Sequence, residues 1–390
     1  MAVVLGDVIR LLDAWYDPRT AEPWDAVGLV TGDPDQEVRR ILFAVDPTDA
    51  VVDEAVAFGA DLLVVHHPLL LTPVHGVAAT TPKGRRLHRL IRSGVALFTA
   101  HTNADVPADG VNEALARAVG IVDPAPIAAA SDGLDKLVTF VPLEHAEAVR
   151  HALAEAGAGR IGDYDTASFT GAGEGRFRPL AGAHPAIGEV GRLEVVPESR
   201  IEVVYPRPAR ARVVTALRES HPYEEPAFDL VELAAVPGVP GERGHGRVGR
   251  LAEPISLRGF AERVAAALPA TAHGVRVAGE RDRTIETVAV GSGAGDALLE
   301  SVLGLDPDVY LTSDLRHHRA AEFLEYDGPA LVDVAHWAAE WTWLPVVESK
   351  LVAALEGRGA TVETRVSTLC TDPWDLHLDS VEPADHQEQR

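Results

Sequence analysis

The chain has 390 residues, of which 46% are hydrophobic and 24% are charged, a balance typical of globular rather than disordered proteins. A formal net charge of −24 repels phosphate backbones and argues against a nucleic-acid partner. The single cysteine, Cys370, excludes an internal disulfide framework and a cysteine-based structural zinc site, so histidine and carboxylate ligands must hold any bound metal.

Short apolar runs alternate with helix-period segments through the first third of the chain. Residues 3–16 have the spacing of a helix, and the later helices end at glycines, as C-caps often do. Strands are predicted over 40–46, 61–65 and 95–100, and helices over 48–59, 83–94 and 110–120. This alternation predicts a mostly parallel sheet covered on both faces.

The middle of the chain has a different order of elements. From Lys136 to Leu233 we predict strand, helix, two strands, helix and strand, the split β-α-β order of ferredoxin-like domains. The predicted strands are 136–142, 191–197, 200–206 and 228–233, the helices are 144–157 and 209–220, and 170–180 is a glycine-rich excursion. This order indicates a small domain inserted into a larger one.

The last third returns to alternating strands and helices. Helices are predicted over 256–268, 296–303, 314–324 and 345–355, and strands over 246–251, 287–291, 308–313 and 329–334. We therefore predict an α/β fold in which two similar α/β layers form one discontinuous three-layer core, with an inserted ferredoxin-like α+β domain.

The domain boundaries are predicted from composition and element order. Segments 121–133 and 234–246 are rich in proline, glycine and alanine, as linkers often are. The predicted parts are 1–130 for the N-terminal half of the core, 134–236 for the insert, 244–370 for the C-terminal half and 371–390 for a flexible tail.

Ligands of open α/β sheets bind beyond the carboxyl ends of the strands, so the residues that follow each apolar run are the first candidates for a site. His66 and His67 directly follow such a run and precede Pro68. Because proline biases the preceding residue toward extended backbone, the two imidazoles are predicted to diverge, which suits two metal ions better than one. The alternative is one strand-end histidine and one in solvent.

A second candidate follows the strand over 95–100, where His101 and Asp105 lie in a short polar stretch. A carboxylate there can bridge two cations, while Thr102 and Asn103 can hold the loop by hydrogen bonds to the backbone. Asn and Asp are also ordinary turn formers, so this stretch carries little weight alone.

The third candidate pair is His336 and Glu340, which follow the strand over 329–334. If a helical turn begins here, their four-residue spacing places them on one face, the geometry of helical zinc sites. In a chain with 16 histidines, an incidental pair on a helix surface is the alternative.

Two further stretches also follow strands. Asp314 is expected to cap the next helix, and His318 lies four residues on, where it could point into the same cleft. Residues 291–299, GSGAGDALL, leave backbone N–H groups open to an anion such as phosphate, although a tight turn is the simpler account.

Together, three strand ends supply donors suited to zinc, iron or manganese. The set can hold two divalent ions roughly 3.5–4 Å apart with positions open for water. Its predicted ligands are His66, His67, Asp105, His336 and Glu340. His101 and His318 are the candidates for proton transfer or substrate contact. The remaining alternative is that no metal binds and the histidines are structural.

Four ordered motifs resemble a known family. They are VVHHPLLL (64–71), FTAHTNAD (98–105), LTSDLRHH (311–318) and VAHWAAE (334–340), with SHPYEEPAFD (220–229) in the insert. In this order they are similar to the Nif-three-like dinuclear metal centre hexameric proteins, often called GTP cyclohydrolase 1 type 2 homologues. The resemblance covers about residues 3–370.

The resemblance implies a toroidal homohexamer with paired-metal sites facing an internal cavity, and an insert similar to CutA-like trimeric modules. It implies metal ligands at the same five positions chosen above. The chain departs from the family pattern at Ala26, where asparagine is usual, and at Ser313 and Ala335, where glycine is frequent. None of these departures changes a ligand.

Two functions fit these residues. The first is a metal-dependent hydrolase, for which the family name implies a purine nucleotide such as GTP, although another small phosphorylated substrate would suit the same site. The alternative is a non-catalytic metal-handling or regulatory protein whose insert senses a ligand. With no apolar run near the roughly 18 residues of a membrane span and no basic signal-peptide start, we expect a cytoplasmic protein without a membrane partner.

Overall fold

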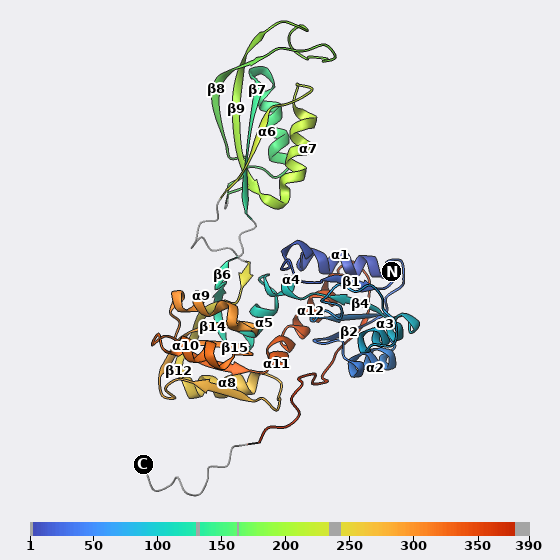
Figure 1. Cartoon of the computed structure of the whole chain (residues 1–390), viewed down its shortest axis with the longest axis vertical. Coiled ribbons are helices and arrows are strands. Elements are labelled where there is room, and N and C mark those ends of the chain that lie inside the picture. Colours follow the sequence, from blue (N-terminus) through green and yellow to red (C-terminus); the bar gives the residue numbers. More distant parts are fainter. Residues whose placement is uncertain (1–2, 130–132, 162–163, 234–242, 379–390) are drawn as a thin grey trace. The chain divides into compact units, whose positions relative to one another are not determined.

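The computed structural model describes residues 3–129, 133–161, 164–233 and 243–378 (Figure 1). The chain divides into two compact units, one formed by 1–130 with 240–390 and the other by 131–239. Among helices of the described ranges, none has the length and apolar character that a bilayer-spanning segment requires. The far part of the predicted tail, 379–390, and most of the second predicted linker lie outside the described residues.

The first sheet of the core has five strands in the order β1-β4-β3-β2-β17. Four are parallel, and β1 lies antiparallel on the β4 edge. The strands are β1 (Gly28–Thr31), β2 (Arg40–Ala44), β3 (Leu62–Val65), β4 (Ala96–Thr99) and β17 (Glu363–Val366). The predicted strands β2, β3 and β4 are confirmed, whereas β1 and β17 were not predicted, because each has only four residues and none of them is fully buried.

Alternating side chains explain why helices cover both faces of this sheet. In β3, Leu62 and Val64 pack into one core with α1 (Leu5–Trp15) and α12 (Leu344–Glu356). Leu63 and Val65 pack into the opposite core with α2 (Asp49–Phe58) and α3 (Pro82–Arg92). Both faces are therefore buried, which is why the strand reads as a continuous apolar run.

The second sheet of the core has six strands in the order β13-β16-β15-β14-β12-β5. Its centre, β14-β15-β16, is parallel, and the other three strands are antiparallel to their neighbours. The strands are β5 (Ile121–Ala125), β12 (Arg247–Ser256), β13 (Val275–Ala278), β14 (Thr284–Ala294), β15 (Val309–Ser313) and β16 (Ala330–Val334). The predicted linker 121–133 therefore begins as a strand, and β6 (Ala128–Ala129) pairs with β11 (Gly244–His245).

Helices also cover both faces of the second sheet. α5 (Val111–Ala118) and α8 (Leu257–Ala267) pack on one face, and α9 (Leu299–Leu305) and α10 (His317–Leu324) on the other. The short helix α11 (His336–Trp341) joins the two cores, since Trp337 packs into the first and Ala339 into the second. The predicted fold of two similar α/β layers is confirmed.

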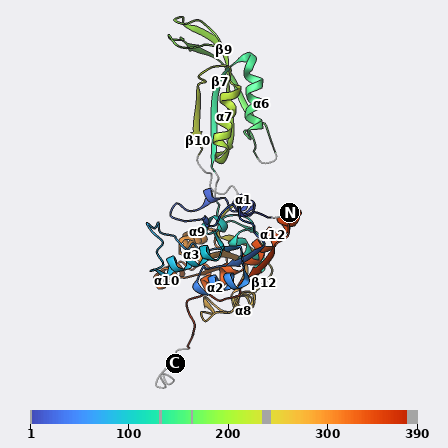
Figure 2. The same ribbon diagram turned by 90° about the vertical axis from the view of Figure 1, so that its right-hand side faces the viewer.

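The inserted unit has the predicted β-α-β-β-α-β order, with an antiparallel sheet ordered β10-β7-β9-β8. Figure 2 shows its two helices side by side along the sheet. The elements are β7 (Leu134–Pro142), α6 (Ala146–Glu155), β8 (Ser168–Phe177), β9 (Glu194–Pro206), α7 (Arg210–Ser220) and β10 (Phe228–Glu232).

Two strand assignments in the insert were wrong. The glycine-rich stretch 170–180 lies mostly in β8, whose side chains are largely exposed and so show no alternation of apolar residues. The predicted strands 191–197 and 200–206 are a single strand, β9. Pro197 is tolerated because β9 pairs only with β8 at that point, since its pairing with β7 ends at Glu198.

A buried arginine links two segments of the core that are distant in sequence. Arg247 is 1% exposed, and its Nε donates to Glu113 Oε2 at 2.8 Å. Its remaining nitrogens donate to the carbonyl oxygens of Val106, Pro107, Gly244 and Gly246. One guanidinium therefore holds the chain directly after α4 (Thr102–Asp105) against the start of β12.

We expect Arg247→Met to lower the free energy of unfolding of the core by about 3 kcal/mol or more, because Glu113 and four carbonyl groups lose a buried donor. The control is Arg250→Met, on the same strand as Arg247. It removes an exposed ion-pair partner of Glu286 and should lower the free energy of unfolding by about 1 kcal/mol at most. Urea unfolding followed by tryptophan fluorescence measures both, since all six tryptophans belong to the unit formed by 1–130 with 240–390 and none belongs to the insert. Equal midpoints for the two variants would contradict this role of Arg247.

Candidate metal centre

The cluster of histidines and carboxylates forms where strand ends from both sheets of the core meet. His66 and His67 directly follow β3, and His101 follows β4 at the start of α4. Asp105 is the last residue of α4. From the second sheet, β16 leads into α11, which begins at His336 and contains Glu340. The site therefore lies at the carboxyl ends of parallel strands, as predicted.

Glu340 lies at the centre of the cluster and is 3% exposed. Its Oε1 is 2.8 Å from His336 Nε2 and 3.4 Å from His66 Nε2, and its Oε2 is 3.0 Å from His67 Nε2. The prediction that His336 and Glu340 share one helix face is confirmed. One carboxylate thus faces three imidazoles.

Two buried atoms in this space, His66 Nε2 and Asp105 Oδ1, have no hydrogen-bond partner and lie 4.0 Å apart. Beside them, Glu340 Oε2 has only its 3.0 Å contact with His67. An unsatisfied buried polar atom costs about 1–3 kcal/mol. Such atoms facing one space indicate that a ligand with several coordination positions belongs there.

Two overlapping groups could hold a metal ion, since the donor atoms in each lie within 4.8 Å of one another. One group is His66, His67 and His101, and the other is His67, His336 and Glu340. Asp105 stands outside both groups and approaches the cluster through His66. His101 was predicted to transfer protons or contact substrate, but it lies close enough to His66 and His67 to bind the same metal ion.

Each imidazole is oriented by an acceptor at its other nitrogen. His66 Nδ1 is 2.8 Å from the carbonyl oxygen of Ala100. The Nδ1 atoms of the other three are 2.7–2.8 Å from carboxylates, with His67 on Asp46, His101 on Asp25 and His336 on Asp314. These contacts favour the tautomer with a proton on Nδ1, which leaves the Nε2 atoms free to bind a cation.

The prediction that Pro68 makes the two adjacent imidazoles diverge is wrong, because the two rings converge. Their ring centroids are 5.1 Å apart, and both Nε2 atoms approach Glu340. β3 ends at Val65, so the alternation of strand side chains no longer applies to the two histidines. They still differ in position, because each approaches a different oxygen of the carboxylate.

Asp314 does not cap the helix that follows it. α10 begins at His317 with Arg316 at its N-cap, and Asp314 adopts a left-handed backbone, φ 58°, that turns its carboxylate to His336. His318 is exposed on α10, and no described contact links it to the cluster. Its ring lies instead 5.2 Å from that of His317.

The loop after β4 is held as predicted. The Asn103 side chain accepts from His101 N and donates to the carbonyl oxygen of Tyr16, and Thr102 Oγ1 accepts from Glu22 N. Asp25 accepts from the Thr102 amide at 3.0 Å, so it fixes both the loop and the His101 ring. The loop is therefore rigid on the side that faces the cluster.

Gly293, in the predicted anion-binding stretch 291–299, lies against the cluster instead. A Cβ atom at this position would be 2.8 Å from Glu340 Oε1 and 3.3 Å from His336 Nε2, and its φ is +67°. The neighbouring amide of Ser292 donates to Asn112 at 2.8 Å and is not open to an anion. The glycine therefore leaves space for the cluster.

The beginning of the predicted tail belongs to the site. Thr371 donates a hydrogen bond from Oγ1 to Asp46 Oδ2, while the other oxygen of Asp46 accepts from His67. Ser367 anchors the segment, since its carbonyl oxygen accepts from Trp341 Nε1 at 2.8 Å and its hydroxyl donates to Glu54. Hydrogen bonds therefore hold the segment from Ser367 to Thr371 against the core.

Burial and the Glu340 charge set the protonation of the cluster. Burial would raise the pKa of Glu340, but the facing His67, His336 and His66 hold it well below its usual range. Burial would lower the pKa values of His67 and His336, yet Glu340 and the carboxylates behind the rings raise them to about 10 and about 11. Without metal, both imidazoles therefore carry protons at neutral pH.

The pKa shifts of His66 and Asp105 both favour the uncharged form in the absence of metal. Burial lowers the pKa of His66, and burial together with the Glu340 charge raises the pKa of Asp105 well above its usual range. A cation in the cluster would replace the two imidazolium protons and favour ionised Asp105. Imidazole nitrogens and carboxylate oxygens in this number suit a divalent transition metal.

The comparisons with known proteins agree with this architecture. The family model Duf34/NIF3 (NGG1p interacting factor 3) matches residues 3–373. The chain belongs to the DUF34/NIF3 family. Proteins named GTP cyclohydrolase 1 type 2 homolog are 53% identical over 381 residues in Mycobacterium tuberculosis, covering 96% of this chain and 98% of that protein, and 36% identical over 368 residues in Bacillus subtilis, covering 94% and 97%.

A solved structure extends the match to three dimensions. The crystal structure of a Bacillus cereus protein related to NIF3 aligns with a TM-score of 0.77 and 34% identity, covering 96% of this chain and 99% of that one. The predicted family and α/β architecture are thereby confirmed.

Several residues that shape the site of this DUF34/NIF3 protein were not predicted to do so. Asp46 ends the predicted strand 40–46, so its position after an apolar run was the signal that could have identified it. Gly293 also follows a predicted strand, but its stretch was interpreted as an anion site or a turn. Asp25 and Thr371 gave no such signal, because their roles depend on contacts with segments distant in sequence. The departures at Ala26 and Ser313 leave the four imidazole contacts in place.

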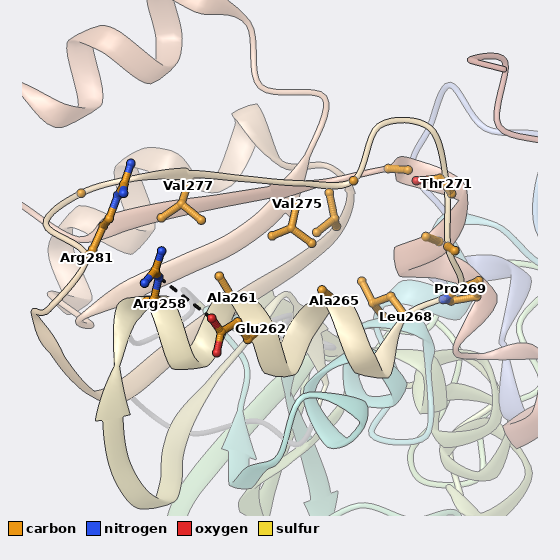
Figure 3. A pocket seen from close by; sticks show the side chains of 16 residues that line it. Arg258, Ala261, Glu262, Ala265, Leu268, Pro269, Thr271, Val275, Val277 and Arg281 are labelled. Carbon is orange, nitrogen blue, oxygen red and sulfur yellow. Dashed lines mark ion pairs between the residues drawn. The ribbon is translucent and has the colours of Figure 1, made fainter. Parts of the chain in front are cut away.

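A groove of about 680 Å³ lies between α8 and the edge strand β13 (Figure 3). Val275 and Val277 of the strand face Ala261 and Ala265 of the helix across it, with Arg258 at one end. Its lining includes Ala335 and Ala338, on either side of His336 in sequence, but none of the cluster residues. The groove therefore borders the β16–α11 junction without supplying a metal ligand.

We expect Asp46→Ala to weaken metal binding about 10–100-fold, because His67 loses the carboxylate that fixes its ring and raises its basicity. Asp53→Ala, which removes an exposed carboxylate from α2, is the matched control and should leave affinity unchanged. Competition with a chromophoric chelator measures both. Equal affinities of Asp46→Ala and the wild-type protein would contradict an orienting role for Asp46.

Metal affinity should rise with pH between about 6 and 9. The pKa values of His67 and His336, about 10 and about 11 in the metal-free protein, lie above this range, so each ring must lose a proton to bind, and this becomes easier as pH rises. Calorimetric titration with Zn²⁺ at pH 7, in buffers of different ionisation enthalpy, measures the protons released. Binding without proton release would show that these rings are not ligands.

Proposed function

We propose that this DUF34/NIF3 protein is a metal-dependent hydrolase that holds two divalent ions, zinc, iron or manganese, at the cluster. The observation that carries the proposal is the buried Glu340 carboxylate, which faces three imidazoles and shares its space with the unpartnered atoms of His66 and Asp105. A single ion would leave donors on one side of Glu340 unused.

The contacts of the cluster suggest two ligand groups. His66 and Asp105, whose facing atoms lie 4.0 Å apart, would hold one ion, and His67 and His336, which form one group with Glu340, would hold the other. When bound, divalent ions lower the pKa of water and stabilise negative charge that develops on the substrate. Single replacement of His66 or His67 should therefore weaken one ion more than the other.

The chain's own side chains would then position the reacting groups. His101 is fixed by Asp25 and lies beside His66 and His67, with ring centroids 5.1 and 5.5 Å away, so it could take a proton at Nε2 or complete a ligand set. Asp46 and Asp314 hold the rings of His67 and His336 in one orientation. The site is therefore preorganised before substrate binds.

For the substrate we propose a small phosphorylated molecule such as a purine nucleotide. The name GTP cyclohydrolase 1 type 2 homolog, carried by relatives that match over almost their full lengths, supports this class. A paired-metal site also suits it, because two cations can offset phosphate charge while water attacks carbon or phosphorus.

We also propose that the protein is a homohexamer, as its resemblance to the family implies. Large apolar side chains exposed on the described part of the insert support association, among them Phe169, Leu180 and Leu193. Light scattering on the purified protein should give six copies per particle, and a monomer would contradict this.

The function is tested by screening metal-loaded protein against nucleotides, phosphodiesters and amides. Turnover should fall more than about 100-fold in both His336→Ala and Glu340→Ala, because each removes a ligand of the shared site. His318→Ala is the control and should keep full activity, since this exposed residue lies outside the cluster. Tight metal binding without turnover of any class would instead favour the metal-handling function.

A further inference from the structure

We propose that the inserted unit has a binding site for a small organic cation, an amidinium or ammonium group on a flat apolar body. The site is a cavity of about 600 Å³ lined by residues of this unit alone. This volume is in the range of small-molecule pockets, about 300–1,000 Å³. Nothing in the proposed hydrolase reaction uses it.

The cavity lies on the face of the insert sheet that the helices leave open. Val141 of β7 and Ile201 of β9 pack with α6 and α7, so Phe140 and Arg200, their neighbours in sequence, point to the other face. Both line the cavity. Residues 172–177 of β8, the segment 178–187, Glu198 and the turn 223–227 contribute the rest of its wall.

A buried carboxylate points into this cavity. Glu198 is 6% exposed, and its Oε1 accepts a hydrogen bond of 2.8 Å from the Tyr223 hydroxyl. No described residue donates a hydrogen bond to its Oε2. Burial of a carboxylate with a single neutral donor is unfavourable unless a further donor is supplied. Because Glu198 lines the cavity, a bound ligand can supply that donor.

Gly175 creates the space beside this carboxylate. It faces β9 from β8, and a Cβ atom there would lie 2.3 Å from Glu198 Oε2 and 2.5 Å from Oε1. Its φ is not in the left-handed region, so the backbone does not require glycine at this position. The absence of a side chain at Gly175 thus makes room for the Glu198 carboxylate and is not needed for a turn.

The motif SHPYEEPAFD forms the other side of the site. His221 Nε2 lies 3.0 Å from the carbonyl oxygen of Phe140, and its Nδ1 accepts from Tyr223 N at 3.0 Å. This buried imidazole therefore fixes the turn that brings the Tyr223 hydroxyl to Glu198. The Tyr223 and Phe177 rings, 5.4 Å apart and edge to face, provide an aromatic wall beside the carboxylate.

The charges at the rim favour a cation. Two of the three lining arginines are already paired, Arg176 with Glu174 and Arg200 with Glu202. The lining carboxylates are Glu174, Glu198, Glu224 and Glu225, against Arg176, Arg178 and Arg200. An amidinium ion can donate two hydrogen bonds to one carboxylate, and aromatic rings attract a cation at short range.

The test uses the full-length, metal-loaded protein with benzamidinium as the probe and benzamide as its neutral isostere. Calorimetric titration should show benzamidinium binding at least tenfold more tightly than benzamide, because only the cation matches Glu198. Glu198→Gln should lose at least tenfold in benzamidinium affinity, while Glu147→Gln, which changes an exposed carboxylate of α6 outside the cavity, should bind as the wild-type protein does.

Gly175→Ala provides a second test that keeps Glu198, because its methyl group would occupy the space beside Oε2 and should also lower affinity at least tenfold. Circular dichroism and retained metal content check that each variant is folded. The proposal is overturned if benzamide binds as well as benzamidinium, if neither binds at about 10 mM, or if either Glu198→Gln or Gly175→Ala binds like the wild-type protein. Metal content and turnover report separately on the hydrolase site.

Discussion

The burial of one carboxylate, Glu340, is the constraint on which the core of this protein depends. A carboxylate removed from water must face positive charge or several donors, and here three imidazoles surround it. His66 and His67 come from the first sheet and His336 from the second, so the charge is compensated only when both sheets are assembled. The histidine and carboxylate cluster is thus also a contact between the two halves of the discontinuous core.

Around this cluster, a second set of carboxylates fixes the orientation of the histidine rings. Asp25, Asp46 and Asp314 each accept from the Nδ1 atom of one ring, and all three lie outside the strands and helices that carry the histidines. Thr371 adds one further link, from the C-terminal segment to Asp46. Two segments more than 300 residues apart in sequence therefore act together to orient the His67 imidazole.

The sequence predicted the parts of this arrangement that periodicity and position encode. The buried strands β2, β3 and β4 read as apolar runs, and His66, Asp105, His336 and Glu340 were placed near one another because each lies at or just after a strand end. The contacts of Asp314 could not be read in this way, because its left-handed backbone overrides the ordinary capping preference of aspartate. The predicted orientation of the His67 side chain was wrong for a related reason, since the alternation of strand side chains stops at Val65.

The β8–β9 hairpin shows the other limit of pattern-based prediction. Its first strand is glycine-rich and largely exposed, so neither alternation nor propensity indicates a strand, and pairing with β9 alone creates it. One of these glycines, Gly175, opens the space in which Glu198 is buried. Glu198 and Glu340 are both buried carboxylates, but Glu340 has imidazole partners whereas a tyrosine hydroxyl is the described donor to Glu198. This difference in compensation is the reason for proposing a metal site in the core and an organic-cation site in the insert.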